Sequence, residues 1–223
     1  DKEFKPLRKE LQMVFQNTLS ALNPRQRIGN ILEDILKIHS NLDAAERREK
    51  VVEVLKKVGL SEDHYFRFPH ELSGGQVQRL GIASALVIGP KLIVCDEPVS
   101  ALDVSIQAQI LNMLMQLQKE LGLSLLFISH DIGVIRFISD RIGVMYLGTL
   151  VEETDTEELF ANPLHPYTKG LFASVPDPYI EREGFSELSG EQPVRTEDFK
   201  GCAFSTRCPN ATEKCRQEAP VFR

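Results

Sequence analysis

Tryptophan, long apolar runs and clustered basic residues are all missing from this 223-residue chain. No stretch approaches the roughly 20 apolar residues that a membrane-spanning helix needs, and no signal peptide opens the chain. The formal net charge is −6, and Lys and Arg form no basic stripe, which argues against a dedicated nucleic-acid surface. With 42% hydrophobic residues the chain can still bury a sizeable core. We therefore expect a soluble protein without nucleic acid as a partner, which reaches any membrane through another subunit.

The pentapeptide LSGGQ, which contains Ser73, Gly74, Gly75 and Gln76, precedes an apolar-rich run over residues 77–88. The serine and the glutamine have the S-x-x-Q spacing of a capping box, which predicts that a helix starts here. The two glycines remove side chains from the first turn, so free N–H groups and the helix dipole could hold a phosphate. For the pentapeptide alone, an ordinary capped helix is the alternative.

The apolar run LIVC at residues 92–95 is followed directly by Asp96 and Glu97. Four consecutive apolar residues between helix breakers predict a strand buried on both faces, as in a parallel sheet. Ligands of open α/β sheets bind beyond the carboxyl ends of the strands, so the two acids would lie where a metal and a reacting water are handled. A solvated turn is the alternative, but the position about twenty residues after a glycine-rich helix start favours the ligand site.

Two more polar groups follow this strand. Asp103, in the sequence SALD, is placed to cap a helix whose apolar residues recur at helical spacing up to Gly122. A second apolar strand over residues 125–128 then delivers His130 to the same edge of the sheet. A histidine after a strand is more often structural, but its place in this series favours a chemical role.

LSGGQ, the strand into the two acids, SALD and the strand into the histidine together resemble the signature motif, Walker B motif, D-loop and switch histidine of ATP-binding-cassette (ABC) ATPases. NPLHPYTKGL at residues 162–171 and GCAFSTRCP at residues 201–209 further resemble the ATPase subunits of oligopeptide, dipeptide and nickel importers. The resemblance covers essentially the whole chain. It implies an α/β fold: a partial ABC ATPase with a RecA-like parallel-sheet core, an α-helical subdomain and a cysteine-containing C-terminal tail.

The resemblance also implies a division of the chain into four parts. These are a core strand with the Q-loop (residues 1–24), the helical subdomain with the signature (25–88), the RecA-like core with Walker B, D-loop and switch histidine (89–175), and a linker with the tail (176–223). The phosphate-cradling Walker A pattern G-x-x-x-x-G-K-[ST], which precedes the Q-loop in the family, occurs nowhere in the sequence. We therefore expect the chain to lack the N-terminal part of the nucleotide-binding domain and to be inactive alone.

The family mechanism assigns a role to each motif. Two cassettes face each other head to tail, and each ATP lies between the Walker A loop of one and the signature of the other. Asp96 would hold Mg²⁺ through water, Glu97 would be the general base on the attacking water, and His130 would bind the γ-phosphate. Gln16, at the end of a predicted strand over residues 11–15, would couple metal and water to the membrane subunit, unless it is only a polar strand end. Asp103 would link the two nucleotide sites.

The rest of the chain shows ordinary secondary-structure signals. Residues 175–200 are rich in proline and acids, which predicts an extended linker. Further expected elements are helices over 28–38, 43–58 and 132–138, a hairpin of strands 142–146 and 149–152, a short helix over 154–160 capped by Thr154 and Glu157, and a helix with Pro166 in its first turn.

Cys202, Cys208 and Cys215 lie in the tail with five and six intervening residues, unlike the C-x2-C pairs of common zinc sites. Disulfides are disfavoured because an ATPase of this kind works in the reducing cytosol. In some peptide-importer ATPases such a tail wraps a [4Fe–4S] cluster with four cysteines, so the three are candidate iron ligands. A structural tail without a ligand is the alternative, and Cys95 is expected in the core.

The resemblance implies an ATP-hydrolysing subunit that powers import of peptides or nickel, with ATP and Mg²⁺ as cofactors. Its partners would be a second ABC ATPase subunit in a homo- or heterodimer, transmembrane permease subunits and, indirectly, an extracytoplasmic solute-binding protein, all at the cytoplasmic face of the cell membrane. Two alternatives are a non-transport ABC ATPase acting on nucleic acid or the ribosome, and a catalytically idle binding module. The importer-type tail weighs against the first, and the intact Glu97 and His130 weigh against the second.

Overall fold

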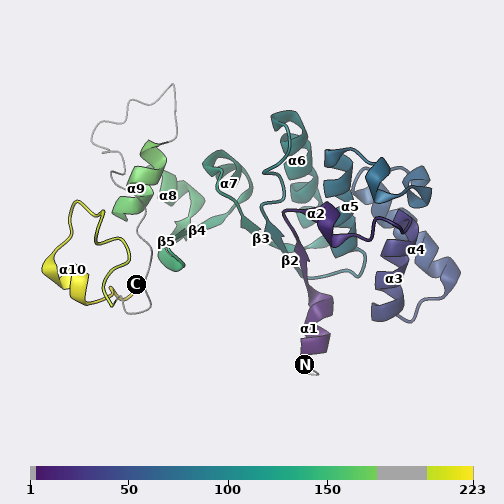
Figure 1. Ribbon diagram of the computed structural model, residues 1–223, viewed down its shortest axis with the longest axis horizontal. Coiled ribbons are helices and arrows are strands. Elements are labelled where there is room, and N and C mark those ends of the chain that lie inside the picture. The colour runs from purple at the N-terminus through teal and green to yellow at the C-terminus, as the bar shows by residue number, and fades with distance from the viewer. Residues whose placement is uncertain (1–3, 175–199, 223) are drawn as a thin grey trace. The chain divides into compact units, whose positions relative to one another are not determined.

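The computed structural model describes residues 4–174 and 200–222. Contacts divide the chain into two compact units, residues 1–131 and residues 132–223, and each is described by itself (Figure 1). No helix among the described residues is both long and apolar enough to cross a bilayer.

The first unit contains a three-stranded parallel sheet with the order β1-β2-β3. Its strands are β1 (Leu11–Val14), β2 (Leu92–Asp96) and β3 (Ser124–Ile128). In the register, Val94 pairs with Met13 on one side and with Leu126 on the other. The predicted parallel sheet is therefore confirmed, and its strands end at one edge, where Gln16, Glu97 and His130 follow.

The two faces of this sheet differ in burial. Val14, Ile93 and Cys95 are buried on one face, where α5 (Gly74–Leu86) packs against β1. On the opposite face Leu11 and Leu126 are 47% and 54% exposed. In β2 itself, Ile93 and Cys95 are buried, whereas Leu92 and Val94 on the opposite face are half-buried, so the expected burial of β2 is complete on one face and partial on the other.

Helical segments make up the rest of the first unit, beginning with α1, which leads directly into β1 (Figure 1). The helix predicted from residue 43 opens with a capping box: the Asp43 carboxylate accepts the N–H groups of Ala45 and Glu46, and the Glu46 carboxylate accepts the N–H of Asp43. The elements are α1 (Phe4–Glu10), α2 (Thr18–Ala21), α3 (Ile28–His39), α4 (Ala44–Lys57), the 3₁₀ helices η1 (Glu62–Phe66) and η2 (Pro69–Glu71), α5, and α6 (Val104–Leu121).

The second unit contains an antiparallel hairpin flanked by short helices. As predicted, the turn falls at Leu147 and Gly148, whose φ angles of 46° and 74° are those that a tight hairpin turn requires. Its elements are α7 (Ile132–Ile138), β4 (Arg141–Tyr146), β5 (Thr149–Asp155), α8 (Thr156–Ala161), α9 (Pro166–Ala173) and α10 (Glu213–Gln217).

One predicted helix start in this unit is wrong. Thr154 does not cap a helix, because it belongs to β5 and pairs there with Ile142. Strand pairing therefore extends to Asp155, and α8 begins at Thr156, two residues later than the capping pattern predicted. The prediction for Pro166 is confirmed, since it is the first residue of α9.

The tail packs onto the hairpin of the second unit through Phe204, which is 1% exposed. Its ring contacts those of Tyr146, Tyr167 and His165 at centroid distances of 5.2, 5.7 and 5.5 Å. Burying an aromatic ring of this size is a large stabilising contribution for a short segment. The predicted linker lies outside the described residues, apart from Lys200.

Candidate active site

The carboxylate of Glu97 lies between an amide and an imidazole at the carboxyl edge of the sheet. Gln16 Nε2 donates to Glu97 Oε2 at 2.8 Å, and His130 Nδ1 lies 2.9 Å from Glu97 Oε1. Each of the three side chains follows a different strand, because parallel strands carry their carboxyl ends to one edge. The structure therefore brings together three of the predicted site residues.

The backbone of Glu97 has a conformation that L-residues rarely adopt, with φ at 45°. It is held there by three hydrogen bonds: its N–H donates to Ile128 O at 3.0 Å, and its carbonyl accepts from Ser100 N at 3.3 Å and Ser100 Oγ at 3.1 Å. Such strain costs on the order of 1–3 kcal/mol and persists where surrounding structure fixes it. The turn directs the Glu97 side chain toward His130.

The two charged groups of this site shift each other's proton affinity. The hydrogen bond from His130 holds the pKa of Glu97 below its ordinary value. The same bond raises the pKa of His130, and the negative charge of Glu97 acts in the same direction. The His130 side chain is 73% exposed and that of Glu97 is 24% exposed, so solvent screens the pair from one side.

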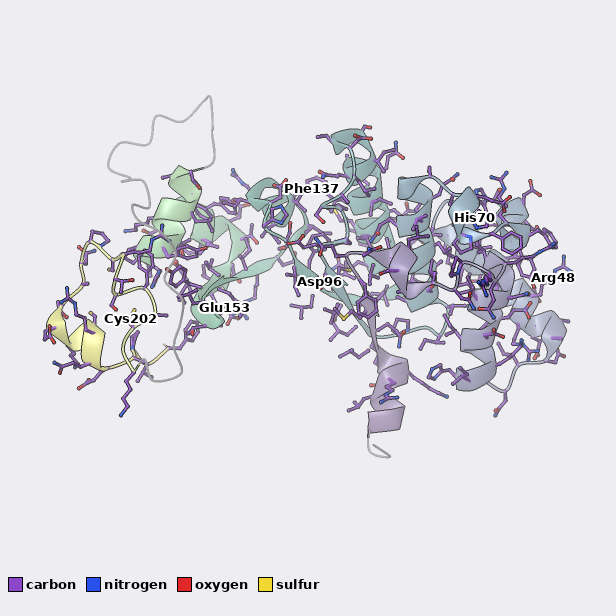
Figure 2. The ribbon with its side chains drawn as sticks, in the orientation of Figure 1. Arg48, His70, Asp96, Phe137, Glu153 and Cys202 are labelled. Carbon is purple, nitrogen blue, oxygen red and sulfur yellow. The ribbon has the colours of Figure 1, made fainter. Side chains whose placement is uncertain are left out.

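Asp96 is the last residue of β2 (Figure 2). Glu97 follows it directly in the chain. Mg²⁺ in nucleotide sites is held by one or two carboxylates together with phosphate oxygens and water. The half-buried carboxylate of Asp96 is of the right chemical type for such a site. Its assignment to the metal stays a prediction.

The signature pentapeptide forms the predicted helix start. Ser73 N donates to Gln76 Oε1 at 3.0 Å, and Gln76 N donates to Ser73 Oγ at 3.4 Å, so the capping box is confirmed. Gln76 also reaches a residue that the sequence did not single out, because its Nε2 lies 3.3 Å from Nε2 of the buried His64. The only sequence hint at His64 was its S-x-x-H spacing from Ser61.

The two signature glycines lie against the start of α6. A Cβ atom at residue 75 would lie 2.7 Å from Ile106 Cγ2, and one at residue 74 would lie 3.7 Å from Leu102 Cδ2. Gly75 therefore allows α6 to approach the signature closely. The prediction that these glycines also admit a phosphate is not tested by these contacts.

Asp103 occupies the predicted N-cap position of α6, but its side chain makes no capping hydrogen bond. The cap prediction is right for the position and wrong for the bond. Gln107 lies one turn further along α6, and its Nε2 donates to Val99 O and Leu102 O, both at 3.0 Å. Nothing in the spacing of the sequence pointed to this residue.

The three tail cysteines do not gather into a metal site. Cys202 N donates to Cys215 O at 2.7 Å, and Thr212 Oγ1 lies 3.2 Å from Cys215 Sγ, a hydrogen bond that lowers the pKa of the Cys215 thiol. The described part of the chain contains no group of three or more histidine, cysteine or acidic side chains that could hold a metal ion. The predicted [4Fe–4S] ligation by Cys202, Cys208 and Cys215 is therefore unsupported. Cys95 is in the core as predicted, and burial raises the pKa of its thiol to about 12.

Comparison with known proteins decides the family. Residues 1–100 match the family described as ABC transporter, and residues 151–215 match the oligopeptide/dipeptide transporter C-terminal region. A dipeptide transport ATP-binding protein of Haemophilus influenzae is 53% identical over 99% of this chain and 68% of its own length. The chain belongs to the ABC transporter ATP-binding family. An oligopeptide transport ATP-binding protein of Salmonella typhimurium is 52% identical over 99% of the chain and 67% of its own length.

Solved ABC cassettes share the fold of this ABC protein. CbiO1 from Clostridium perfringens, part of an ABC transporter complex, aligns with a TM-score of 0.65 and 30% identity over 72% of this chain and 63% of its own. A dimeric ATP-binding cassette in a post-hydrolysis state with ADP and Pi aligns with a TM-score of 0.61 and 33% identity, over 70% of this chain and 67% of its own. The chain thus spans about two thirds of the length of its relatives, and the predicted α/β ABC fold is confirmed.

Proposed function

We propose that this chain is part of an ATP-hydrolysing subunit that powers peptide import through an ABC transporter. The observation that carries the proposal is the carboxylate of Glu97 held by Gln16 and His130 at the edge of a parallel sheet. Peptide as the transported class is supported by the names of the relatives and by the match of residues 151–215 to the peptide-transporter C-terminal region.

In the proposed reaction, Glu97 takes a proton from water while the water oxygen attacks the γ-phosphorus and the bond from phosphorus to the ADP oxygen breaks. Each oxygen of Glu97 has one partner and a second lone pair, so the carboxylate can accept a hydrogen bond from the water while both contacts remain. A bound γ-phosphate would compete with Oε1 of Glu97 for the His130 imidazolium, because both are anionic acceptors of charge-assisted hydrogen bonds. Gln16 would keep the other oxygen oriented, and Asp96 would bind Mg²⁺.

The signature would act on a second nucleotide. In a head-to-tail dimer, Ser73, Gly74, Gly75 and Gln76 would face the ATP bound by the other ATPase subunit, and Asp103 would link the two sites. The partners would be that second subunit, the transmembrane permease subunits and, indirectly, an extracytoplasmic solute-binding protein. This assembly would place the chain at the cytoplasmic face of the membrane. The four-part division of the chain into Q-loop strand, helical subdomain, core and tail belongs to the same proposal.

A phosphate-cradling loop is required for this function, and residues 1–223 contain no G-x-x-x-x-G-K-[ST] pattern. We therefore expect residues 1–223 alone to bind Mg-ATP weakly and to hydrolyse it at a negligible rate. Calorimetry and a phosphate-release assay check both expectations. Tight binding with turnover would contradict them.

The deciding experiment replaces Glu97 in an importer subunit that carries these residues together with a phosphate-binding loop. Glu97→Gln keeps the shape of the side chain but removes the base, so kcat should fall by about a hundredfold or more. ATP binding should remain, and the closed dimer should accumulate. Glu49→Gln, which neutralises an exposed acid on α4, is the matched control and should leave turnover unchanged. Near-native turnover of Glu97→Gln would remove Glu97 as the base.

An iron–sulfur cluster is left out of the proposed function. Its candidate ligands, Cys202, Cys208 and Cys215, form no metal-binding group in the part of the chain that the structure describes. Phe204 and its aromatic contacts account for how the tail is held in the second unit.

A further inference from the structure

The loop from Glu97 to Asp103 joins two elements that the proposed function assigns to different nucleotides. At its first residue it carries the proposed base of one site. Near its far end, Leu102 and, in the first turn of α6, Ile106 lie where side chains at the signature glycines of the same chain would be, and this signature would serve the other site. The shape of this loop therefore determines how the two elements are placed relative to each other.

Three hydrogen bonds within the loop hold its backbone in shape. Ser100 donates to Glu97 O through both its N–H and its hydroxyl, and Leu102 N donates to Val99 O at 3.2 Å. These bonds close residues 97–102 into two overlapping turns. They do not connect the loop to α6, whose first backbone bonds are made by Ile106 and Gln107 to Asp103 O.

Gln107 supplies the missing connection. Its Nε2 donates one hydrogen to Val99 O and the other to Leu102 O, each at 3.0 Å, so a single amide nitrogen binds both ends of the second turn. This bond pattern needs two donors on one atom at the length of a glutamine side chain. Glutamate would present oxygen lone pairs to both carbonyl groups, and alanine would leave both without this donor.

We infer that Gln107 is a positioning residue for the proposed reaction: it fixes the loop between Glu97 and Asp103 against α6, so that the base of one site and the signature of the other move together. Gln107 touches neither nucleotide nor water in this scheme and acts through Val99 and Leu102. The inference rests on the proposed function, because it takes Glu97 as the base.

The test compares Gln107→Glu with Gln109→Glu in the assembled importer. Gln109 is exposed, lies two residues further along the same helix and accepts a hydrogen bond from Arg79. It therefore receives the same new charge away from the loop. With Gln107→Glu, kcat at saturating ATP should fall by about tenfold or more, which corresponds to about 1.4 kcal/mol in the barrier. The KM for ATP should change by less than about twofold, because the substitution leaves ground-state contacts to the nucleotide in place. Gln109→Glu should change neither.

A second readout reports on the loop directly. In residues 1–223, the amides of Ser100 and Leu102 should exchange with deuterium at least about tenfold faster in Gln107→Glu than in Gln109→Glu, because the turn loses the bonds that hold it to α6. Gln107→Ala introduces no charge and decides the question if Gln107→Glu does not fold. Equal kcat for the Gln107 and Gln109 variants, or unchanged exchange at Leu102, would overturn the inference. Failure of the proposed function gives a different result, namely full turnover of Glu97→Gln.

Discussion

Thr18 occupies the space that a side chain at Gly81 would need. A Cβ atom at residue 81 would lie 2.6 Å from Thr18 Cγ2 and 2.7 Å from Thr18 Oγ1. The Thr18 hydroxyl also lies 3.0 Å from Gln78 Oε1 in a buried contact. The segment that follows Gln16 is thereby packed against the helix that the signature opens, and both Thr18 and Gln78 were missed by the sequence analysis.

This contact predicts that Gly81→Ala destabilises the protein, although glycine-to-alanine changes usually stabilise a helix. Alanine favours a helix interior over glycine by about 1 kcal/mol, but at Gly81 the added methyl group overlaps Thr18. Because overpacking costs about 1–3 kcal/mol, Gly81→Ala should lower the free energy of unfolding. Denaturant unfolding of residues 1–223 measures it. Thr18→Ala in the same chain should recover part of the loss, and a stabilised Gly81→Ala single variant would contradict the packing argument.

The Glu97–His130 pair predicts a pH dependence. His130 has a raised pKa, so its contribution to stability is complete below the ordinary histidine pKa and is lost as pH rises through the raised value. Glu97 has a lowered pKa, so its contribution is complete above the ordinary glutamate pKa and is lost as pH falls through the lowered value. In an NMR titration of residues 1–223, Glu97→Gln should move the His130 midpoint downward. An unchanged midpoint would mean that the pair is not formed in solution.

In the proposed head-to-tail dimer, each signature completes the nucleotide site of the other subunit. Mixed dimers test this arrangement. Ser73→Arg removes the cap of α5 and fills the first turn with a large side chain, so it should block the site completed by that signature. A dimer with Ser73→Arg on one subunit and Glu97→Gln on the other should retain one intact site. The dimer with both changes on the same subunit should retain none. Equal ATPase rates for the two dimers would contradict head-to-tail sharing.

Phe204 predicts how the tail is held. Its ring is buried against Tyr146, Tyr167 and His165, and truncating a buried phenylalanine costs about 3–5 kcal/mol. Phe204→Ala should therefore loosen the tail and speed its limited proteolysis beyond residue 200. Phe222→Ala, at a position that is 50% exposed, is the control and should behave like the native chain. ATP hydrolysis in the assembled importer should be largely kept, because the tail follows every motif of the proposed site.

The sequence by itself determined the local elements and the identity of the motifs. Helix starts at Asp43 and Ser73, the ends of β2 and β3, and the hairpin turn at Leu147 and Gly148 depend on residues within one turn of each other, so spacing alone predicts them. The one helix start that failed, at Thr154, failed because strand pairing with Ile142 extended further than the local capping pattern could indicate.

Only the tertiary structure decided which distant side chains meet. Gln16 and Glu97 are 81 residues apart, and Glu97 and His130 are 33 apart, so their contact depends on strand order and on the turn at Glu97. The same holds for Thr18 against Gly81 and for Gln107 beneath the loop, which no periodic pattern marks. In the tail, the sequence predicted three cysteines as candidate iron ligands. The structure instead holds the tail through the buried ring of Phe204 and the backbone hydrogen bond from Cys202 to Cys215. Spacing along a chain fixes neighbours within a helix or turn, whereas packing of the whole unit fixes the contacts between them.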